Sequence, residues 1–312
     1  MSISPSRHFA SLHDGINYLS ETYSGEVLLE AIDHKEHTQR GRVRSPSFLF
    51  RGESSQYLTT TATMQRISAE QALSQRARKL VPGLASYIEE QLRDFLNMSE
   101  MESAGFAQHY GLPTELIDLT SSPSVAAFFA ADGEPGTKGY LAAFPVASMA
   151  SSSILIDLRE HSSAERPRRQ HAFAIFNRRH TDLKSSPCIA ELGSTWFSFS
   201  LRKSDKDRYY YPQLSLLDCH TDAVAGALQL VVDTMIQKHG KLPDELAAWF
   251  SKRIAAAPFV TKATKWHASG KPAEVELVPL AVTDIPYNEE SEREKSYRYW
   301  SSKYSVVSRT EA

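Results

Sequence analysis

Apolar side chains recur three and four residues apart in several segments of the chain, which is the spacing of one helix face. Pro82 and Gly83 separate two of these segments, because both residues disfavour a helix interior. Ser122 followed by Pro123 has the sequence of a helix start, a hydroxyl N-cap and then proline at the first helical position. The pattern predicts helices over residues 8–23, 68–79, 84–97, 100–110, from 123 onwards, 221–239, 244–256 and through 297–300.

Shorter apolar runs, bounded by polar and glycine-containing connections, predict strands. The first, residues 47–50, ends at Arg51, where Gly52 would let the chain turn sharply. Residues 33–46, rich in His, Arg and Ser, predict a loop. The remaining predicted strands are residues 116–119, 139–146, 153–158, 173–176, 196–201 and 275–282.

These elements predict an α+β fold with a mixed or antiparallel sheet core, flanking helices and a helical C-terminal addition. We expect an N-terminal helix and loop in residues 1–45 and a core in residues 46–205. Residues 206–312 would form a helical extension with one late strand.

The composition is that of an ordinary globular protein, with 41% hydrophobic and 23% charged residues among 312. The net charge is −2, so no overall field attracts nucleic acid or a membrane. Two cysteines, Cys188 and Cys219, predict free thiols rather than a disulfide framework. No apolar run approaches the roughly 20 residues of a membrane helix, and the N-terminus lacks the apolar core of a signal peptide. We therefore expect a cytoplasmic protein, or an effector exported without a signal peptide.

Residues 108–130 combine a Gln-His pair, a turn, an acid, three hydroxyls and a helix start. Such a density of polar groups among apolar ones is unfavourable unless the groups are paired or used. Asp118, Thr120 and Ser122 end a strand and open a helix, whose free N–H groups attract anions; plain helix capping explains them equally well. His109 is a candidate general base, although a lone histidine beside a turn more often hydrogen-bonds the backbone.

Arginines are the other candidates for anion binding. Arg51 can grip a phosphate with two parallel hydrogen bonds, or can simply pair with a carboxylate. Residues 159–179 hold six arginines against two acids, which suits either a phosphate-rich partner or a solvated loop. The chain has no zinc-ligand spacing, Walker loop, nucleophile elbow or dinucleotide glycine fingerprint, so these classes of enzyme are disfavoured and no metal is expected.

Two stretches of the chain closely resemble the FRG domain family. They are the triplet Phe50-Arg51-Gly52 and the run Gln108-His109-Tyr110-Gly111-Leu112-Pro113-Thr114. Further matching positions are Leu116, Asp118, Thr120, Ser122, Pro123 and residues 125–130, with Tyr57, Leu58 and Arg66 upstream. Residues 166–173, which contain Gln170, resemble the third motif of the family. Glu115 and Leu119 depart from the resemblance, because the family usually has Arg and Trp there.

The layout is similar to that of ADP-ribosyltransferases, in which an aromatic-Arg-Gly strand precedes a Ser/Thr strand end, an Ala/Phe-rich helix and a late Glu or its substitute. This resemblance implies a split-sheet core and NAD as co-substrate. Arg51 and Gly52 would hold a phosphate or ribose of NAD, and Thr120 and Ser122 would place the nicotinamide ribose. Cleavage would pass through an oxocarbenium-like state.

The late catalytic position stays open at this point. Gln170 follows from the third motif, but it has no negative charge, so catalysis would then lean on His109 or Asp118. The alternatives are Glu191, Glu274 and Glu276.

Three functions follow from the sequence. The first is NAD-dependent ADP-ribosyl transfer to a protein, nucleic acid or nucleotide, by a bacterial toxin, effector or phage-defence protein with an antitoxin or defence-system partner. The second is a non-catalytic nucleotide- or nucleic-acid-binding module, whose binding would weaken with salt. The third makes the same residues structural and assigns the arginine-rich run to protein association.

Overall fold

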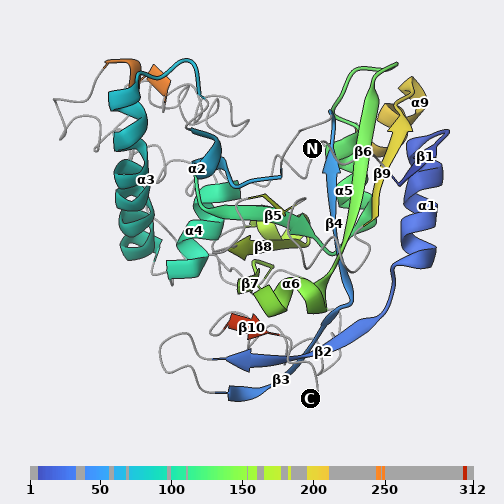
Figure 1. The fold of residues 1–312 in the computed structure, drawn as a ribbon, viewed down its shortest axis with the longest axis horizontal. Coiled ribbons are helices and arrows are strands. Elements are labelled where there is room, and N and C mark those ends of the chain that lie inside the picture. The colour runs from blue at the N-terminus through green and yellow to red at the C-terminus, as the bar shows by residue number, and fades with distance from the viewer. Residues whose placement is uncertain are drawn as a thin grey trace, which may run out of the picture.

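The computed structural model is a mixed α+β fold around a mostly antiparallel sheet (Figure 1). It describes residues 6–32, 39–55, 60–67, 70–96, 100–109, 112–152, 154–159, 165–176, 182–183, 195–210, 244–246, 248–249 and 305–307. The predicted α+β class is confirmed. The predicted segments 221–239, 275–282 and 297–300, and most of 244–256, lie outside the described residues.

The described strands form one sheet in the order β1-β9-β6-β4-β5-β8-β7-β10-β2-β3. They are β1 (Arg7–Phe9), β2 (Glu26–Ile32), β3 (Gln39–Pro46), β4 (Phe48–Glu53), β5 (Leu116–Thr120), β6 (Lys138–Pro145), β7 (Ile154–Asp157), β8 (Ala172–Phe176), β9 (Thr195–Ser200) and β10 (Ser305–Val307). β1 pairs parallel with β9, and the other pairs are antiparallel. β4 and β5 are joined by a single residue pair, Phe50 with Thr120. The sheet therefore divides at this joint into two arms, which run in different directions in Figure 1.

Helices cover both arms of the sheet. They are α1 (Leu12–Thr22), α2 (Thr63–Arg66), α3 (Gln75–Leu96), α4 (Glu100–His109), α5 (Pro123–Ala130), α6 (Val146–Ser152), α7 (Glu165–Arg169) and α9 (Lys203–Asp205), followed by the π-helical turn η3 (Lys206–Tyr210). α1 and α5 pack on the arm that contains β4, β6 and β9, while α3 and α4 pack together on the far side of β5 (Figure 1). Among the described helices, none combines the length and the apolar character needed to cross a membrane.

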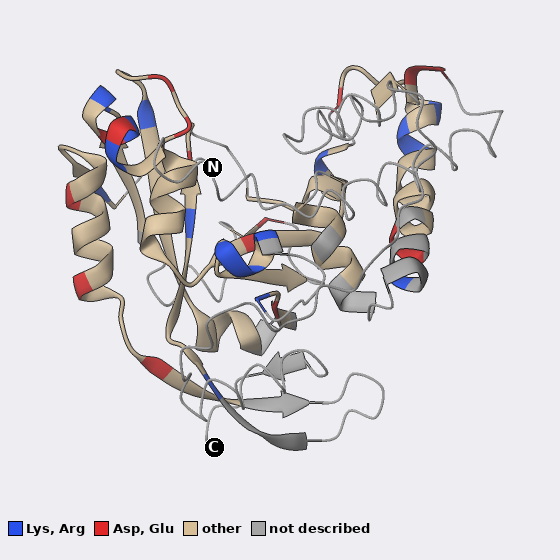
Figure 2. Cartoon of the chain, turned by 180° about the vertical axis from the view of Figure 1, so that it is seen from behind, with Lys and Arg blue, Asp and Glu red and all other residues tan. Residues whose placement is uncertain are grey.

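The alternation of side chains along β6 explains why both faces of this arm are buried. Tyr140, Ala142 and Phe144 belong to one core cluster, and Leu141 and Ala143 belong to the cluster under α1 and α5. A strand that is covered on both faces is apolar at nearly every position. Basic and acidic residues are interspersed over the described elements (Figure 2), in keeping with the net charge of −2.

Most of the predicted elements are confirmed. The strands predicted at 116–119, 139–146, 153–158, 173–176 and 196–201 correspond to β5, β6, β7, β8 and β9. The helix predicted over 8–23 begins only at Leu12, because Ser11 caps it by accepting a hydrogen bond from the Asp14 N–H and residues 7–9 form β1. The helix predicted at 100–110 is α4, which the structure describes as Glu100–His109.

The predictions for residues 39–46 and for residues 82–83 are wrong. Residues 39–46 are not a loop but form β3, which pairs with β2; polar residues such as Arg44, which forms an ion pair with Glu26, are tolerated at a sheet edge. Nor do Pro82 and Gly83 separate two helices, since α3 runs through both. The buried stripe of Ala77, Val81 and Ala85 continues across the proline, and its packing outweighs the lost backbone hydrogen bond.

The division of the chain at residues 45 and 205 stays a prediction. The sheet itself takes β1, β2 and all of β3 except Pro46 from residues 1–45, and it takes β10 from residues 206–312.

Candidate functional site

The four residues predicted as catalytic meet where β4 crosses β5. β4 contributes Arg51, β5 contributes Asp118, α4 ends at His109, and Gln170 follows α7. β4 and β5 share only one residue pair, so their backbones are not hydrogen-bonded along their length. Side chains of both strands line two cavities near this joint.

Arg51 is bound to the protein on two of its three nitrogens. Its Nε donates to Glu53 Oε1 at 3.0 Å, and its Nη1 donates to the Asp118 carbonyl oxygen at 2.7 Å. Among the described residues Nη2 has no partner, and the side chain is 21% exposed. Arg51 therefore pairs with a carboxylate and still presents one N–H group to a ligand. An Arg51→Ala variant would remove the Arg51 guanidinium from the buried Glu53 carboxylate, so we expect it to destabilise the fold.

Gly52 lies inside β4, so the prediction of a sharp turn there is wrong. A Cβ at this position would lie 1.8 Å from the carbonyl oxygen of Ala126 in α5. The glycine is thus required by the close packing of α5 on β4. It also lines one of the cavities described below, so a ligand role for its backbone stays a prediction.

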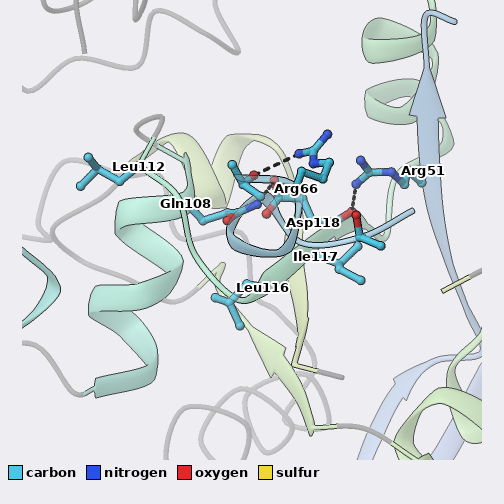
Figure 3. Close-up of a pocket in the computed structure, with 9 residues that line it drawn as sticks. Arg51, Arg66, Gln108, Leu112, Leu116, Ile117 and Asp118 are labelled. Atoms are coloured by element: carbon cyan, nitrogen blue, oxygen red, sulfur yellow. Dashed lines mark hydrogen bonds between the residues drawn. The ribbon is translucent and has the colours of Figure 1, made fainter. Parts of the chain in front are cut away.

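Asp118 is hydrogen-bonded to Arg51 through its carbonyl oxygen and to Gln108 through its carboxylate (Figure 3). Its Oδ2 accepts a hydrogen bond from Gln108 Nε2 at 2.9 Å, and the Gln108 amide oxygen accepts one from the Thr114 hydroxyl. The Asp118 side chain is 39% exposed. Gln108 therefore orients the carboxylate that faces the site.

His109 is oriented by Gln170. The His109 side chain is 5% exposed, and its Nδ1 lies 3.0 Å from Gln170 Oε1. An amide oxygen only accepts hydrogen bonds, so Nδ1 carries the proton and Nε2 keeps a lone pair. That Nε2 faces Asp118 Oδ1 at 3.9 Å, and the His109 carbonyl oxygen accepts from Arg166 Nη1 at 2.8 Å.

Neither His109 Nε2 nor Asp118 Oδ1 has a hydrogen-bond partner in the described structure, and both atoms are closed to solvent. Burial lowers the pKa of His109 below its ordinary value; Asp118 opposes this, the charge of Arg166 adds to it, and the hydrogen bond to Gln170 opposes it. The ring is therefore neutral at pH 7, and two hydrogen-bond acceptors face each other with no proton between them. Buried unpaired groups of this kind are rare and occur at functional sites. The pair can take up a proton or a hydrogen-bond donor.

Thr120 and Ser122 hold the joint between β5 and α5. The Thr120 hydroxyl donates to the Gln170 carbonyl oxygen at 2.8 Å and accepts from the Ser122 N–H at 3.0 Å. Ser122 Oγ accepts from the Val125 N–H at 3.4 Å, which confirms the predicted N-cap with Pro123 at the helix start. Their predicted contact with a ribose stays a prediction.

Two cavities adjoin at Arg51 and Asp118, which line both. The larger, about 220 Å³, is shown in Figure 3, and its other lining residues are Thr61, Thr63, Arg66, Gln108, Leu112, Leu116 and Ile117. The smaller, about 140 Å³, is also lined by Phe50, Gly52, His109, Leu119, Thr120, Phe129, Gln170 and Ala172.

Sequence reasoning missed several of these residues as site residues. Arg66 belonged to a segment that resembles the FRG family, which was the available signal, whereas nothing marked Thr61 or Thr63. Within the arginine-rich run, Arg159 is buried and its Nη2 lies 2.7 Å from Asp157 Oδ2, and Arg166 is buried against the carbonyl of residue 109. These two arginines are therefore structural cations and not part of a solvated loop.

The other candidates lie outside the described part of the chain or line neither cavity. Glu191, Glu274 and Glu276, like Cys188 and Cys219, lie outside the described residues. Glu115 is exposed and lines neither cavity. Within the part of the chain that the structure describes, no group of three or more His, Cys, Asp or Glu side chains could hold a metal ion.

Comparison with known protein families gives a match in the N-terminal half of the chain. No curated protein and no solved structure matches the chain. The model of the FRG domain family matches residues 46–138, a segment that contains Arg51, His109 and Asp118, while Gln170 lies beyond it. The resemblance drawn from the Phe-Arg-Gly and Gln-His motifs is thereby confirmed over this segment. The chain carries an FRG domain in residues 46–138.

Proposed function

We propose that the chain transfers ADP-ribose from NAD to an acceptor, and that the cavities around Arg51 and Asp118 form its active site. One observation carries the proposal: the site is divided into an arginine- and threonine-lined cavity and a cavity that contains a neutral buried histidine beside a carboxylate. NAD has two matching parts, a diphosphate and a nicotinamide riboside.

The larger cavity suits the diphosphate. Arg51 and Arg66 line it, and Thr61 and Thr63 add hydroxyl groups. Guanidinium groups bind phosphate oxygens through charge-assisted hydrogen bonds, which are stronger than neutral ones. Asp118 also lines this cavity, and its Oδ2 already accepts a hydrogen bond from Gln108 Nε2.

The smaller cavity suits the nicotinamide end. Its volume of about 140 Å³ is close to that of a cavity that accommodates one benzene ring. NAD is larger than either cavity and would have to span both, with Arg51 at the point where they adjoin.

In this proposal the residues of the chain act as follows. The bond between ribose C1 and the nicotinamide nitrogen breaks, and its electron pair leaves with neutral nicotinamide. Once nicotinamide has moved away from His109, the acceptor attacks C1 and gives up its proton to His109 Nε2. The resulting imidazolium is stabilised by the Asp118 carboxylate on one side and by Gln170 Oε1 on the other, before the proton passes to solvent.

A non-catalytic nucleotide-binding module is the second candidate, because Gln170 is neutral and its amide oxygen already accepts from His109. Among the described residues that line the two cavities, Asp118 is the one carboxylate. Binding without turnover would result if Asp118 cannot stabilise the oxocarbenium-like state alone.

The test is release of nicotinamide from NAD, with cell lysate supplied as acceptor. Arg51→Lys keeps a cation beside Glu53 but loses the planar fork of donors, so release should fall sharply. Arg44→Lys is the matched control, since Arg44 is an exposed arginine of β3 that pairs with Glu26. Saturable NAD binding without release would favour the second candidate.

A further inference from the structure

We infer that the smaller cavity recognises one six-membered ring bearing an amide or amino group. His109 and Asp118 accept hydrogen bonds from the N–H donors of that group. The inference rests on the proposed function for the identity of the ring, because nicotinamide is the ring that NAD would bring. The recognition itself needs no turnover.

The first step is the pair of acceptors. His109 Nε2 and Asp118 Oδ1 lie 3.9 Å apart, and neither has a partner in the described structure. One nitrogen placed about 2.9 Å from each can bridge them, and an NH₂ group has two protons to donate. A carboxylate in the same place donates nothing and is repelled by Asp118.

The second step is access. Both acceptor atoms are closed to solvent, His109 is fixed by Gln170, and Asp118 is 39% exposed while lining both cavities. Asp118 is therefore the side chain that turns to admit the ligand nitrogen. Its Oδ2 bond to Gln108 limits how far it turns.

The third step is the tautomer of His109. Gln170 Oε1 keeps the proton on His109 Nδ1, which leaves Nε2 as an acceptor. Gln170 is thus a positioning residue. Without it, the proton can move to Nε2, and the site then loses one of its two acceptors for the amide.

The last step is the wall of the cavity. Phe129 is 36% exposed, lies on α5 and lines the cavity together with Phe50 and Ala172. An exposed aromatic side chain offers a surface on which a flat ring can stack. The volume of about 140 Å³ suits one six-membered ring and not a purine.

The test is calorimetric titration of the full chain with nicotinamide and with nicotinate at neutral pH. These probes have the same ring and differ in the amide against the acid. We expect nicotinamide to bind at least about tenfold more tightly than nicotinate, because only the amide satisfies both acceptors. Equal affinities, or no binding of nicotinamide at millimolar concentration, would overturn the inference.

Variants distinguish a loss of amide recognition from a general loss of fold stability. Gln170→Leu should reduce the preference for the amide, and Gln170→Glu, which keeps an acceptor oxygen toward Nδ1, should retain it. Phe129→Ala should weaken both probes equally. His8→Asn, a replacement of a histidine on β1 outside the cavities, should change neither affinity. An unchanged preference in Gln170→Leu would overturn the role of Gln170.

Two further comparisons identify the source of the ring and separate this inference from the proposed function. Cytosine carries the same donor chemistry on a six-membered ring, and uracil lacks the amino group; tighter binding of cytosine than of nicotinamide would assign the ring to a pyrimidine nucleotide. Preference for nicotinamide without NAD cleavage would support the recognition and refute the transfer. NAD cleavage without any amide preference would do the reverse.

Discussion

The replacement of Gly52 by alanine tests how the joint between β4 and α5 is built. The added Cβ would lie 1.8 Å from the Ala126 carbonyl oxygen and 2.8 Å from the Ala130 nitrogen, both backbone atoms of α5. Backbone atoms cannot swing aside as the end of a flexible side chain can. The helix as a whole must therefore move away from the strand until the contact reaches at least 3.4 Å.

The size of the effect follows from what α5 buries. Ala126, Ala127 and Ala130 are 0% exposed and Phe128 is 1% exposed, so a shift of the helix opens the core under α1. Insertion of one methyl group into a close-packed core typically costs about 1–3 kcal/mol. Because relaxation here requires movement of a helix, we expect Gly52→Ala to lower the free energy of unfolding by about 3 kcal/mol or more.

The assay is urea unfolding of the full chain, with Gly83→Ala as the matched control. Gly83 lies inside α3 with no atom within 4 Å of an added Cβ, so alanine there should stabilise the protein by about 0.5–1 kcal/mol. The packing argument would be refuted if the free energy of unfolding of Gly52→Ala stayed within about 1 kcal/mol of the wild-type value while ligand binding was lost. The glycine would then serve the approach of the ligand.

Three further predictions concern single groups. Arg159→Ala leaves the enclosed Asp157 carboxylate with one backbone N–H as its partner among the described residues, so the free energy of unfolding should fall by about 3 kcal/mol in urea; a loss under about 1 kcal/mol would contradict this. Ser122→Ala removes the N-cap that the Val125 N–H uses and should lower the same quantity by about 1 kcal/mol, whereas an unchanged unfolding midpoint would show that the cap contributes nothing. Because the pKa of His109 is lowered in the folded state, the unfolded chain binds the proton first as the pH falls below 6.5. The free energy of unfolding should therefore decline with acid, and less steeply in His109→Asn. Identical pH profiles of the two proteins would argue against a buried neutral ring.

Local patterns predicted the centre of the fold well. The strands β5 to β9 and the start of α5 follow from apolar runs and from a Ser-Pro helix start, both of which are short-range signals. β3 was missed because a polar strand at a sheet edge has no apolar run to mark it, whereas β2 does contain an apolar run, Val27 to Leu29, that was overlooked. The continuity of α3 was missed because the buried stripe that supports it extends past Pro82 and outweighs the local signal.

The candidate site was predictable in its members but not in their partners. Arg51, His109, Asp118 and Gln170 were all singled out, and they do meet at one joint. The links that define their roles join segments far apart in the chain, such as the bond from His109 to Gln170, and no spacing in the sequence reveals them. Tertiary packing alone also shows that Gly52 serves the approach of α5.

Nicotinamide release from NAD by the wild type, by Arg51→Lys and by Arg44→Lys is the most direct test of the central claim. The proposed function predicts release by the wild type and by Arg44→Lys, and a large loss in Arg51→Lys, because lysine keeps the charge near Glu53 but cannot offer the same fork of donors to a phosphate. Release by Arg51→Lys at the wild-type rate, or no release by any of the three proteins with lysate present, would contradict the claim.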